Sequence, residues 1–298
     1  MRILHLDAGK ELRGGQWQVL RLLEGLAAAG VESTLLARPG SPLFEAARRQ
    51  GRRVEPLGLA RAVLLGSRHD LLHAHDARSH TLGAMAASDR LLVSRRVAFA
   101  PGGMPGSRWK YRRARHYLAV SEFVKAVLES AGVPEENISV VYDGVPLLPP
   151  AQGFAVVAPA YAGDPQKGAP LALEAARLAG VELQLSSDLE RHLKQAAVFV
   201  YITHSEGLGS GALMAMSAGV PVVASRVGGL REIVRHRETG LLVENRVEEI
   251  AAAIRELLAD PALAQHLGQA ARRDVMERFT VDRMVRRTME IYHRVLEC

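Results

Sequence analysis

Short apolar runs alternate with helix-like patterns along the whole sequence, and this alternation constrains the fold more than any other feature. The first half has apolar runs at 2–6 and 32–37, separated by a segment whose apolar residues recur at helical spacing. The second half repeats the rhythm, with runs at 156–160 and 198–202. Strands that alternate with helices form parallel sheets with crossover helices on their faces. The sequence therefore predicts an α/β protein made of doubly wound sheets.

A proline-rich segment separates the two halves. Residues 144–150 read Gly-Val-Pro-Leu-Leu-Pro-Pro, and prolines fix the backbone and remove hydrogen-bond donors. A chain of 298 residues is also long for one compact core. We therefore expect two domains in tandem, which bind their ligand where the carboxyl ends of the strands lie.

Composition excludes several classes of protein. Apolar residues make up 48% and charged residues 23% of the chain, which is typical of a globular protein. The single cysteine, Cys298, excludes an intramolecular disulfide. The segment 1–7 becomes polar too early for a signal peptide, and no apolar run approaches the roughly 20 residues that cross a bilayer. We expect a soluble, cytoplasmic protein.

Basic residues concentrate between Arg95 and Arg115, with aromatic residues among them. A solvated basic face is the simplest interpretation. Contact with an anionic membrane surface, peripheral to the inner face, is the second. Nucleic-acid binding is disfavoured because no nucleic-acid motif accompanies the patch. The basic residues are Arg95, Arg96, Arg108, Lys110, Arg112, Arg113 and Arg115, and the aromatic ones are Trp109, Tyr111 and Tyr117.

Two glycine-rich segments are candidates for phosphate binding. Gly14 and Gly15 lie between the first expected strand and a helix, where free N–H groups and the helix dipole favour an anion. A plain turn is an equally good explanation of this pair. The second segment, 204–211, reads His-Ser-Glu-Gly-Leu-Gly-Ser-Gly and stands between a strand ending at Ile202 and another helix. Its Glu206 is placed to accept hydrogen bonds from sugar hydroxyls.

The stretch 204–234 resembles the retaining glycosyltransferases of family 4, which have the GT-B fold. The family's Glu-Gly-Phe-Gly is similar to Glu-Gly-Leu-Gly at 206–209. Its Gly-x-Pro-Val-Val-Ala-Ser and Gly-Gly-x-x-Glu match 219–225 and 228–232. Weaker similarities at 73–76, 120–122, 143–145, 166–168 and 238–243 extend the resemblance across nearly the whole chain.

The resemblance implies two Rossmann-like domains that face each other across a cleft. It places an N-terminal, acceptor-side domain at 1–147 and a nucleotide-sugar-binding domain at 148–279. The last helix, 280–298, resembles the one that crosses back onto the N-terminal domain in this family.

The resemblance also implies roles for particular residues. Lys167 would neutralise the donor diphosphate. Glu206 would contact the transferred sugar, and His75 would approach the reacting centre. His73 is a rival to His75, and a packed, hydrogen-bonded ring is the alternative for either. The residues that would hold phosphate oxygens are Gly14, Gly15, Gly207, Leu208, Gly209 and Ser210. No metal-ligand cluster is visible in the sequence, and no cofactor is implied beyond the nucleotide sugar.

Three departures from the family concern nucleotide recognition. The family's second glutamate, which receives the ribose hydroxyls, corresponds to Met214, whose thioether accepts such bonds weakly. The arginine five positions before the family's lysine corresponds to Ala162. The segment 181–199 is too short for the additional strand and helix that the family usually has before Glu206.

The sequence thus predicts a metal-independent hexosyl- or glycosyltransferase that uses a nucleotide-diphosphate sugar. Its acceptor would be an envelope polysaccharide, a lipopolysaccharide or a lipid-linked sugar. The alternative is a non-catalytic GT-B protein that binds a sugar or a partner and has lost part of the nucleotide site. A GT-B epimerase or phosphorylase is disfavoured because the carboxylates or the anion site that it needs cannot be identified.

Overall fold

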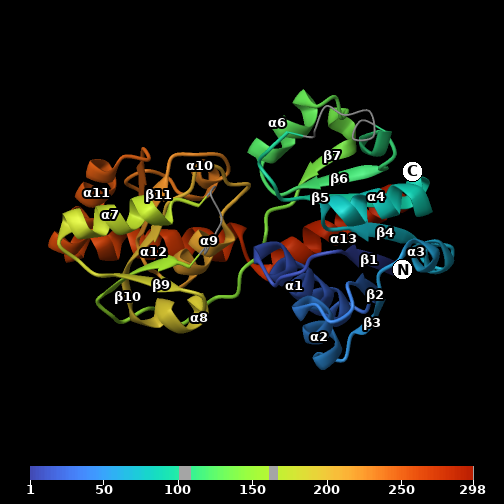
Figure 1. Ribbon diagram of the computed structural model, residues 1–298, viewed down its shortest axis with the longest axis horizontal. Helices are drawn as coiled ribbons and strands as arrows, with labels where there is room; N and C mark the ends of the chain where they lie inside the picture. Colours follow the sequence, from blue (N-terminus) through green and yellow to red (C-terminus); the bar gives the residue numbers. More distant parts are fainter. Residues whose placement is uncertain (101–108, 161–166, 298) are drawn as a thin grey trace. The chain divides into compact units, whose positions relative to one another are not determined.

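The computed structural model describes residues 1–100, 109–160 and 167–297, and the chain divides into two compact units (Figure 1). Unit 1 combines Met1–Gly144 with Val281–Cys298, and unit 2 comprises Val145–Thr280. The chain therefore leaves unit 1 and returns to it with its last helix, α13 (Val281–Glu297). The expected boundaries, 147 and 279, lie a few residues from these divisions. Ala162 and Arg108 fall outside the described residues.

Unit 1 is built on a seven-stranded parallel sheet with the order β3-β2-β1-β4-β5-β6-β7. The chain builds outward from β1 to β3 and then returns to add β4 on the other side of β1. The loops that follow β1 and β4 therefore diverge, which is where open α/β sheets bind ligands. The strands are β1 (Arg2–Asp7), β2 (Glu32–Ala37), β3 (Arg53–Pro56), β4 (Leu71–Ala74), β5 (Leu91–Arg95), β6 (His116–Ala119) and β7 (Ile138–Val140).

The helices of unit 1 begin at residues whose side chains or backbone suit a helix start. Ser41 accepts a hydrogen bond from the Phe44 N–H at 3.2 Å, and Pro42 takes the first helical position, where its missing N–H costs nothing. Asp76 and Ser121 cap two further helices in the same way. The helices besides α13 are α1 (Gly14–Ala28), α2 (Pro42–Arg49), α3 (Leu59–Gly66), α4 (Ala77–Ala86) and α6 (Glu122–Ser130), with 3₁₀ turns η1 (Ser88–Arg90) and η2 (Glu135–Asn137).

Unit 2 is built on a five-stranded parallel sheet with the order β12-β11-β10-β8-β9. Its order reverses between β8 and β10, so the loops after these two strands form the ligand-binding edge expected of this topology. The strands are β8 (Ala155–Pro159), β9 (Leu183–Ser186), β10 (Ala196–Tyr201), β11 (Val222–Ser225) and β12 (Leu241–Val243). The helices are α7 (Ala169–Ala179), α8 (Leu189–His192), α9 (Ser210–Ser217), α10 (Leu230–Ile233), α11 (Val247–Ala259) and α12 (Pro261–Arg278), with a 3₁₀ turn η3 (Leu193–Gln195).

Each unit has its own apolar core, as the doubly wound arrangement requires. In unit 2 the β-branched residues of β10 and β11 pack against Ile250 and Ile254 of α11. In unit 1 Leu22 and Leu26 of α1 pack with Val285 of α13 over the sheet. In the part of the chain that the structure describes, no helix has the length and apolar character needed to cross a bilayer.

Two histidines lie inside the sheet of unit 1. His5 of β1 pairs in register with His73 of β4, and both side chains are fully buried. Burial, and then the charge of His69, lower the pKa of His5 to about 3. Burial, followed by the charges of neighbouring groups, also holds the pKa of His73 well below its usual range. The folded unit therefore keeps both rings neutral at physiological pH.

The contact between α1 and α13 can be tested at Gly25. A β-carbon on this glycine would lie 2.3 Å from Cγ2 of Val285, a stiff β-branched side chain. We expect Gly25→Ala to lower the free energy of unfolding of unit 1 by about 1–3 kcal/mol. Val285→Ala removes the overlap, so the two changes together should cost about 1–2 kcal/mol less than their sum.

Urea unfolding followed by tryptophan fluorescence measures this coupling in unit 1 alone, because both tryptophans, Trp17 and Trp109, belong to that unit. Strictly additive effects of the two substitutions would contradict the contact.

The buried histidine of β1 should make unit 1 sensitive to acid. His5 stays neutral in the folded protein, whereas the unfolded chain takes up a proton at this ring below about pH 6.5. The stability that depends on the neutral ring is thus complete above pH 6.5 and is lost as the pH falls toward 3. Asparagine does not titrate, so His5→Asn should reduce the loss of unfolding free energy between pH 7 and pH 5 by about 2 kcal/mol.

The same urea titrations at the two pH values measure this effect. His293→Asn, at an exposed ring on α13, is the control. An equal change in both variants would contradict the assignment of the acid sensitivity to His5.

Candidate functional site

Lys167 and Glu206 meet at the reversal in the strand order of unit 2. Lys167 follows β8 and Glu206 follows β10, the two strands that flank the reversal. Nζ of Lys167 lies 2.6 Å from Oε2 of Glu206, and the two side chains are only 15% and 16% exposed. The topology thus joins two residues that the sequence assigned to one donor site.

The backbone near Lys167 is held against the end of β10. The N–H of Gly168 donates to the carbonyl of Ile202 at 2.9 Å, and Lys167 forms a bridge with Thr203. A β-carbon on Gly168 would lie 2.5 Å from Cγ2 of Ile202, so a larger residue would push the lysine away. Glycine at this position allows the ammonium to reach Glu206.

Glu206 is fixed by three donors. Besides Lys167, the Tyr201 hydroxyl donates to Oε2 at 2.8 Å, and the Gly207 N–H donates to Oε1 at 3.1 Å. These three hydrogen bonds hold the carboxylate in one orientation. The sequence did not predict a role for Tyr201; its position as the last residue of a strand beside the glycine-rich loop was the available signal.

The glycine-rich loop ends in α9 with free backbone donors. Gly209 has a φ of +107°, and a β-carbon there would lie 2.5 Å from Leu230, so only glycine suits the position. The N–H of Leu213 donates to the Gly209 carbonyl and begins the helical hydrogen bonds. Among the described residues, the N–H groups of Leu208, Gly209 and Ser210 have no acceptor. Such donors at a helix N-terminus attract an anion.

This loop is not filled by its own side chains. The Leu208 side chain is buried in unit 2, and Gly207 and Gly209 have none. A β-carbon on Gly229 would lie 2.0 Å from the Gly207 carbonyl oxygen, so the Gly-Gly pair at 228–229 lets α10 approach closely and support the loop. The backbone of this loop has the geometry that the predicted anion cradle needs, and anion binding here stays a prediction.

In unit 1 the first turn of α1 lies at the corresponding reversal. Gly14 is exposed and Gly15 is half-buried, and both lie inside the helix, which begins two residues earlier than the pattern predicted. The Asp7 carboxylate accepts hydrogen bonds from the Gly9 N–H at 2.8 Å and from Nε2 of Gln16 at 3.2 Å. Burial, and then the charge of Asp76, raise the pKa of Asp7 to about 6.

His75 lies among buried polar groups rather than on the surface. Its Nε2 lies 3.0 Å from Nδ1 of His5, and its Nδ1 lies 3.5 Å from Nη1 of Arg96. Burial, followed by the charges of its neighbours, holds the pKa of His75 well below its usual range. The ring is therefore neutral and serves as a hydrogen-bonding group.

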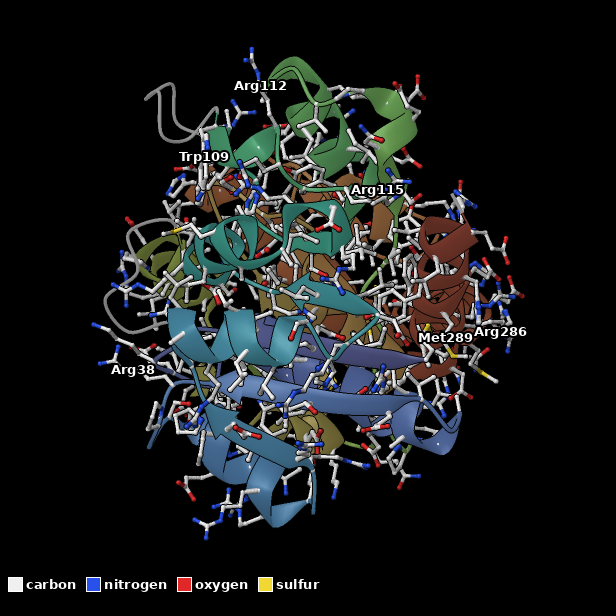
Figure 2. All side chains as sticks on the ribbon, turned by 90° about the vertical axis from the view of Figure 1, so that its right-hand side faces the viewer. Arg38, Trp109, Arg112, Arg115, Arg286 and Met289 are labelled. Carbon is white, nitrogen blue, oxygen red and sulfur yellow. The ribbon has the colours of Figure 1, made fainter. Side chains whose placement is uncertain are left out.

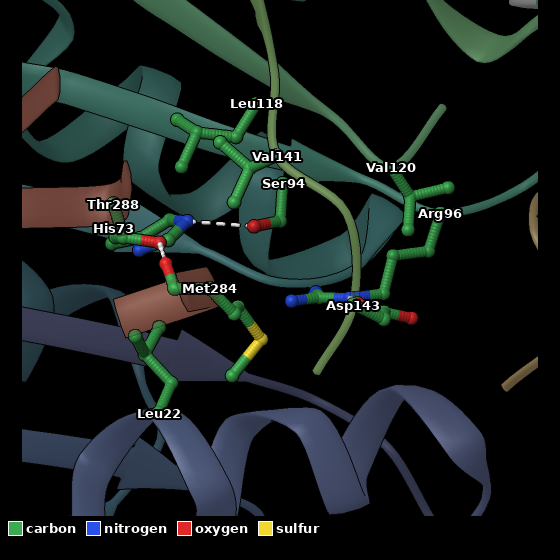
Figure 3. Close-up of a pocket in the computed structure, with 10 residues that line it drawn as sticks. All are labelled: Leu22, His73, Ser94, Arg96, Leu118, Val120, Val141, Asp143, Met284 and Thr288. Atoms are coloured by element: carbon green, nitrogen blue, oxygen red, sulfur yellow. Dashed lines mark hydrogen bonds and ion pairs between the residues drawn. The ribbon is translucent and has the colours of Figure 1, made fainter. Parts of the chain in front are cut away.

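His73, the rival candidate, has both ring nitrogens engaged. Nδ1 lies 2.6 Å from the Tyr292 hydroxyl, and Nε2 lies 2.8 Å from Oγ of Ser94, as Figure 3 shows for the serine. Beside it is a cavity of about 10 Å³, roughly the room for one water molecule. This arrangement makes His73 a packed residue that ties α13 to the sheet.

No pattern in the sequence pairs Arg96 with Asp143. Arg96 follows β5, and its Nε donates to Oδ1 of Asp143 at 3.0 Å (Figure 3). The two side chains are 15% and 9% exposed. Their separation by 47 positions left no local pattern to find.

Among the described residues, three histidines lie close enough together to be considered as metal ligands. Ring nitrogens of His5, His73 and His75 lie within 4.8 Å of one another. Their hydrogen bonds to each other, to Tyr292 and to Ser94 already use most of these nitrogens. The group therefore fits a hydrogen-bonded cluster of neutral rings better than a set of metal ligands.

The basic stretch 95–115 is not a uniform solvated face. The Arg95 guanidinium is buried, donates to the Tyr111 hydroxyl at 2.8 Å and to the Phe99 carbonyl, and stacks on both rings. Arg96 is ion-paired inside the unit, so both arginines must be removed from the predicted surface patch. Arg112 and Arg115 are exposed, and Figure 2 shows Arg112 and Trp109 in the upper part of the view, with Arg115 lower and to the right.

Two family models match most of the chain. The model described as Glycosyltransferase Family 4 matches residues 12–147, and the model described as Glycosyl transferases group 1 matches residues 163–274. An uncharacterized glycosyltransferase of Methanocaldococcus jannaschii is 34% identical over 110 residues, 37% of this chain. N-acetyl-alpha-D-glucosaminyl L-malate synthase of Bacillus anthracis is 33% identical over 105 residues, 35% of this chain. The aligned part is 28% of the length of either relative.

Solved structures match over the full length at low identity. HepE of Anabaena, solved in complex with UDP and glucose, has a TM-score of 0.86 at 18% identity, covering 98% of this chain and 99% of HepE. Sucrose-phosphate synthase of Thermosynechococcus elongatus has a TM-score of 0.80 at 20% identity, covering 100% and 99%. These similarities confirm the predicted α/β class and GT-B fold. With the two family models, they show that this chain belongs to the family 4-like glycosyltransferases of the GT-B fold.

Proposed function

We propose that this protein transfers a sugar from a nucleotide-diphosphate sugar, and that unit 2 binds the diphosphate. The observation that carries the proposal is the placement of the Lys167 ammonium and the free N–H groups of 208–210 at one edge of the sheet. An ammonium and a helix N-terminus are the groups that proteins use to hold phosphate oxygens. In the transfer step they stabilise the negative charge that develops on the departing diphosphate.

In this proposal Glu206 pairs with Lys167 when the site is empty and with the donor sugar when the site is occupied. Without a ligand its carboxylate neutralises Lys167. A diphosphate that takes over the ammonium leaves Glu206 held by the Tyr201 hydroxyl and the Gly207 N–H. The carboxylate then accepts hydrogen bonds from the hydroxyls of the donor sugar, which we propose is a hexose transferred with retention of configuration and without a metal. In unit 1 by itself, Gly14 and Gly15 at the start of α1 are proposed to offer their N–H groups to a phosphate oxygen.

Three structures of one similar protein support a uridine nucleotide. HepE of Anabaena was solved with UDP and glucose, with UDP and with UDP-glucose, and this chain covers at least 99% of it in each comparison. HepE, which this chain matches over nearly its whole length, is therefore seen in these structures with UDP or UDP-glucose. The short segment 181–199 is therefore a weaker argument for a lost nucleotide site than the sequence suggested.

An envelope glycan is the acceptor that we propose. The lipopolysaccharide outer core galactosyltransferase WaaB has a TM-score of 0.73 at 14% identity, covering 99% of this chain. The exposed Arg112 and Arg115, with Trp109 at 41% exposure, supply the cations and the amphipathic ring that suit the inner face of an anionic membrane.

Membrane contact is tested by sedimentation with vesicles. We expect the protein to pellet with phosphatidylglycerol vesicles and not with phosphatidylcholine vesicles, because each basic residue near an anionic surface contributes about 1 kcal/mol. Reversing the charges at Arg112 and Arg115 to Glu should abolish the pelleting, whereas Arg53→Glu on β3 should retain much more of it. Equal pelleting of both variants would remove these two arginines from the proposal.

The donor site is tested by calorimetry with UDP, GDP and ADP. Lys167→Met should weaken the affinity for the preferred nucleotide by about 10- to 100-fold, because a charge-assisted contact is lost. Lys194→Met, at an exposed lysine of the same unit, is the matched control. Glu206→Gln should bind the nucleotide at least as tightly as the wild type, since a competitor for Lys167 is removed, but should transfer sugar more slowly.

Two results would contradict the proposal. Equal affinities of Lys167→Met and Lys194→Met would exclude Lys167 from the site. No heat from any of the three nucleotides would favour the non-catalytic alternative, which the replacement of the family's glutamate by Met214 supports.

A further inference from the structure

Arg96 of unit 1 has a charged side chain that is held by defined contacts with several neighbours. It follows β5 at the carboxyl edge of the sheet, and its stem lies over the first turn of α1, with Cδ 3.9 Å from the place of a β-carbon on Gly15. Its side chain is 15% exposed. The guanidinium therefore lies beside the N-terminal glycines of α1 while still reaching solvent.

Two neighbours fix this guanidinium from one side. Nε donates to Oδ1 of Asp143 at 3.0 Å, and Nη1 lies 3.5 Å from Nδ1 of His75. A guanidinium has five N–H donors, and none of the described residues accepts from Nη2. The edge that remains has the planar fork that pairs with two oxygens of a phosphate.

The hydrogen bonds also determine where the histidine protons lie. A guanidinium can only donate, so Nδ1 of His75 accepts and Nε2 of His75 carries the proton. That proton is donated to Nδ1 of His5 at 3.0 Å, which leaves the proton of His5 on Nε2. Nε2 of His5 is buried and has no partner among the described residues. An unpaired buried donor is costly, so this arrangement of rings lowers the stability of unit 1.

We propose that Arg96 binds a phosphate-type oxyanion, and that His75 and His5 are positioning residues that hold Arg96 for it. His75 supplies the acceptor for Nη1, and His5 fixes the tautomer of His75. Asp143 accepts from Nε of the same guanidinium. The place of this contact in the reaction rests on the proposed function, because the oxyanion belongs either to the donor diphosphate or to an anionic acceptor.

Inorganic phosphate is the first probe, titrated calorimetrically into the full chain. Arg96→Gln should weaken the affinity for phosphate by about 10- to 100-fold, and Arg96→Lys should lose less because it keeps the charge without the fork. Arg53→Gln, at an arginine of β3 whose side chain is 57% exposed, is the matched control. Equal affinities of Arg96→Gln and Arg53→Gln would overturn the proposal.

The positioning role is tested at His5 with a pair of variants. Asn places an oxygen near the position of Nδ1 and can accept from His75, whereas Leu cannot. His5→Leu should weaken phosphate binding several-fold, and His5→Asn should restore it. Nitrogen NMR of the histidine rings should show His75 protonated on Nε2 in the wild type and shifted by phosphate. A proton on Nδ1 of His75 would overturn the positioning role even if His5→Leu fails to fold.

UDP separates the two sources of the oxyanion and separates this proposal from the proposed function. If Arg96 contacts the donor, Arg96→Gln weakens UDP binding as Lys167→Met does. If it contacts an anionic acceptor, Arg96→Gln loses phosphate binding but keeps the affinity for UDP. A wild-type chain that binds phosphate through Arg96 but does not bind UDP would sustain the Arg96 contact while the proposed donor site fails.

Discussion

The ion pair between Lys167 and Glu206 is the interaction on which the account of unit 2 depends. The ammonium of Lys167 lies 2.6 Å from the carboxylate of Glu206, and both groups are mostly shielded from water. Partly buried charges are tolerated only when they are paired, so the site without ligand needs Glu206. We propose that a diphosphate replaces that carboxylate, because it offers more charge and finds further donors in the adjacent loop. The same pair would then account both for the ligand-free site and for its proposed affinity for a diphosphate.

The strand order explains why the candidate groups gather where they do. In unit 2 the reversal lies between β8 and β10, and in unit 1 between β1 and β4. Loops after such strands diverge from each other and leave backbone donors uncovered. Lys167, Glu206 and the glycine-rich loop occupy this position in unit 2, and Gly15 and His75 occupy it in unit 1. Each unit therefore offers polar groups at one edge, above a sheet whose interior is apolar.

The sequence was most informative where a local pattern carries the structure. Buried parallel strands are continuous apolar runs, and glycine loops precede helices, so the sheets and the position of the glycine-rich loop before α9 were predictable. The strand β3 and the helix α3 were not predicted, because β3 reads Arg-Val-Glu-Pro and lies at the sheet edge, where no apolar run is needed. Arg95 was assigned to the surface because charge alone does not reveal a side chain that stacks on Tyr111.

Residues that act through distant partners were the least predictable. Arg96 and Asp143 acquire their roles only when the sheet of unit 1 brings separate loops together. The choice between His73 and His75 also depended on tertiary contacts, because Tyr292 of the last helix reaches His73 across 219 positions. The spacing of residues in the sequence cannot predict a contact between His73 and Tyr292.

A crystal structure of the full chain with UDP would test the central claim most directly. The account predicts that Nζ of Lys167 leaves Glu206 and lies within about 3 Å of a phosphate oxygen, with the N–H groups of Leu208–Ser210 directed at the diphosphate. UDP bound elsewhere, with Lys167 still paired to Glu206, would contradict it.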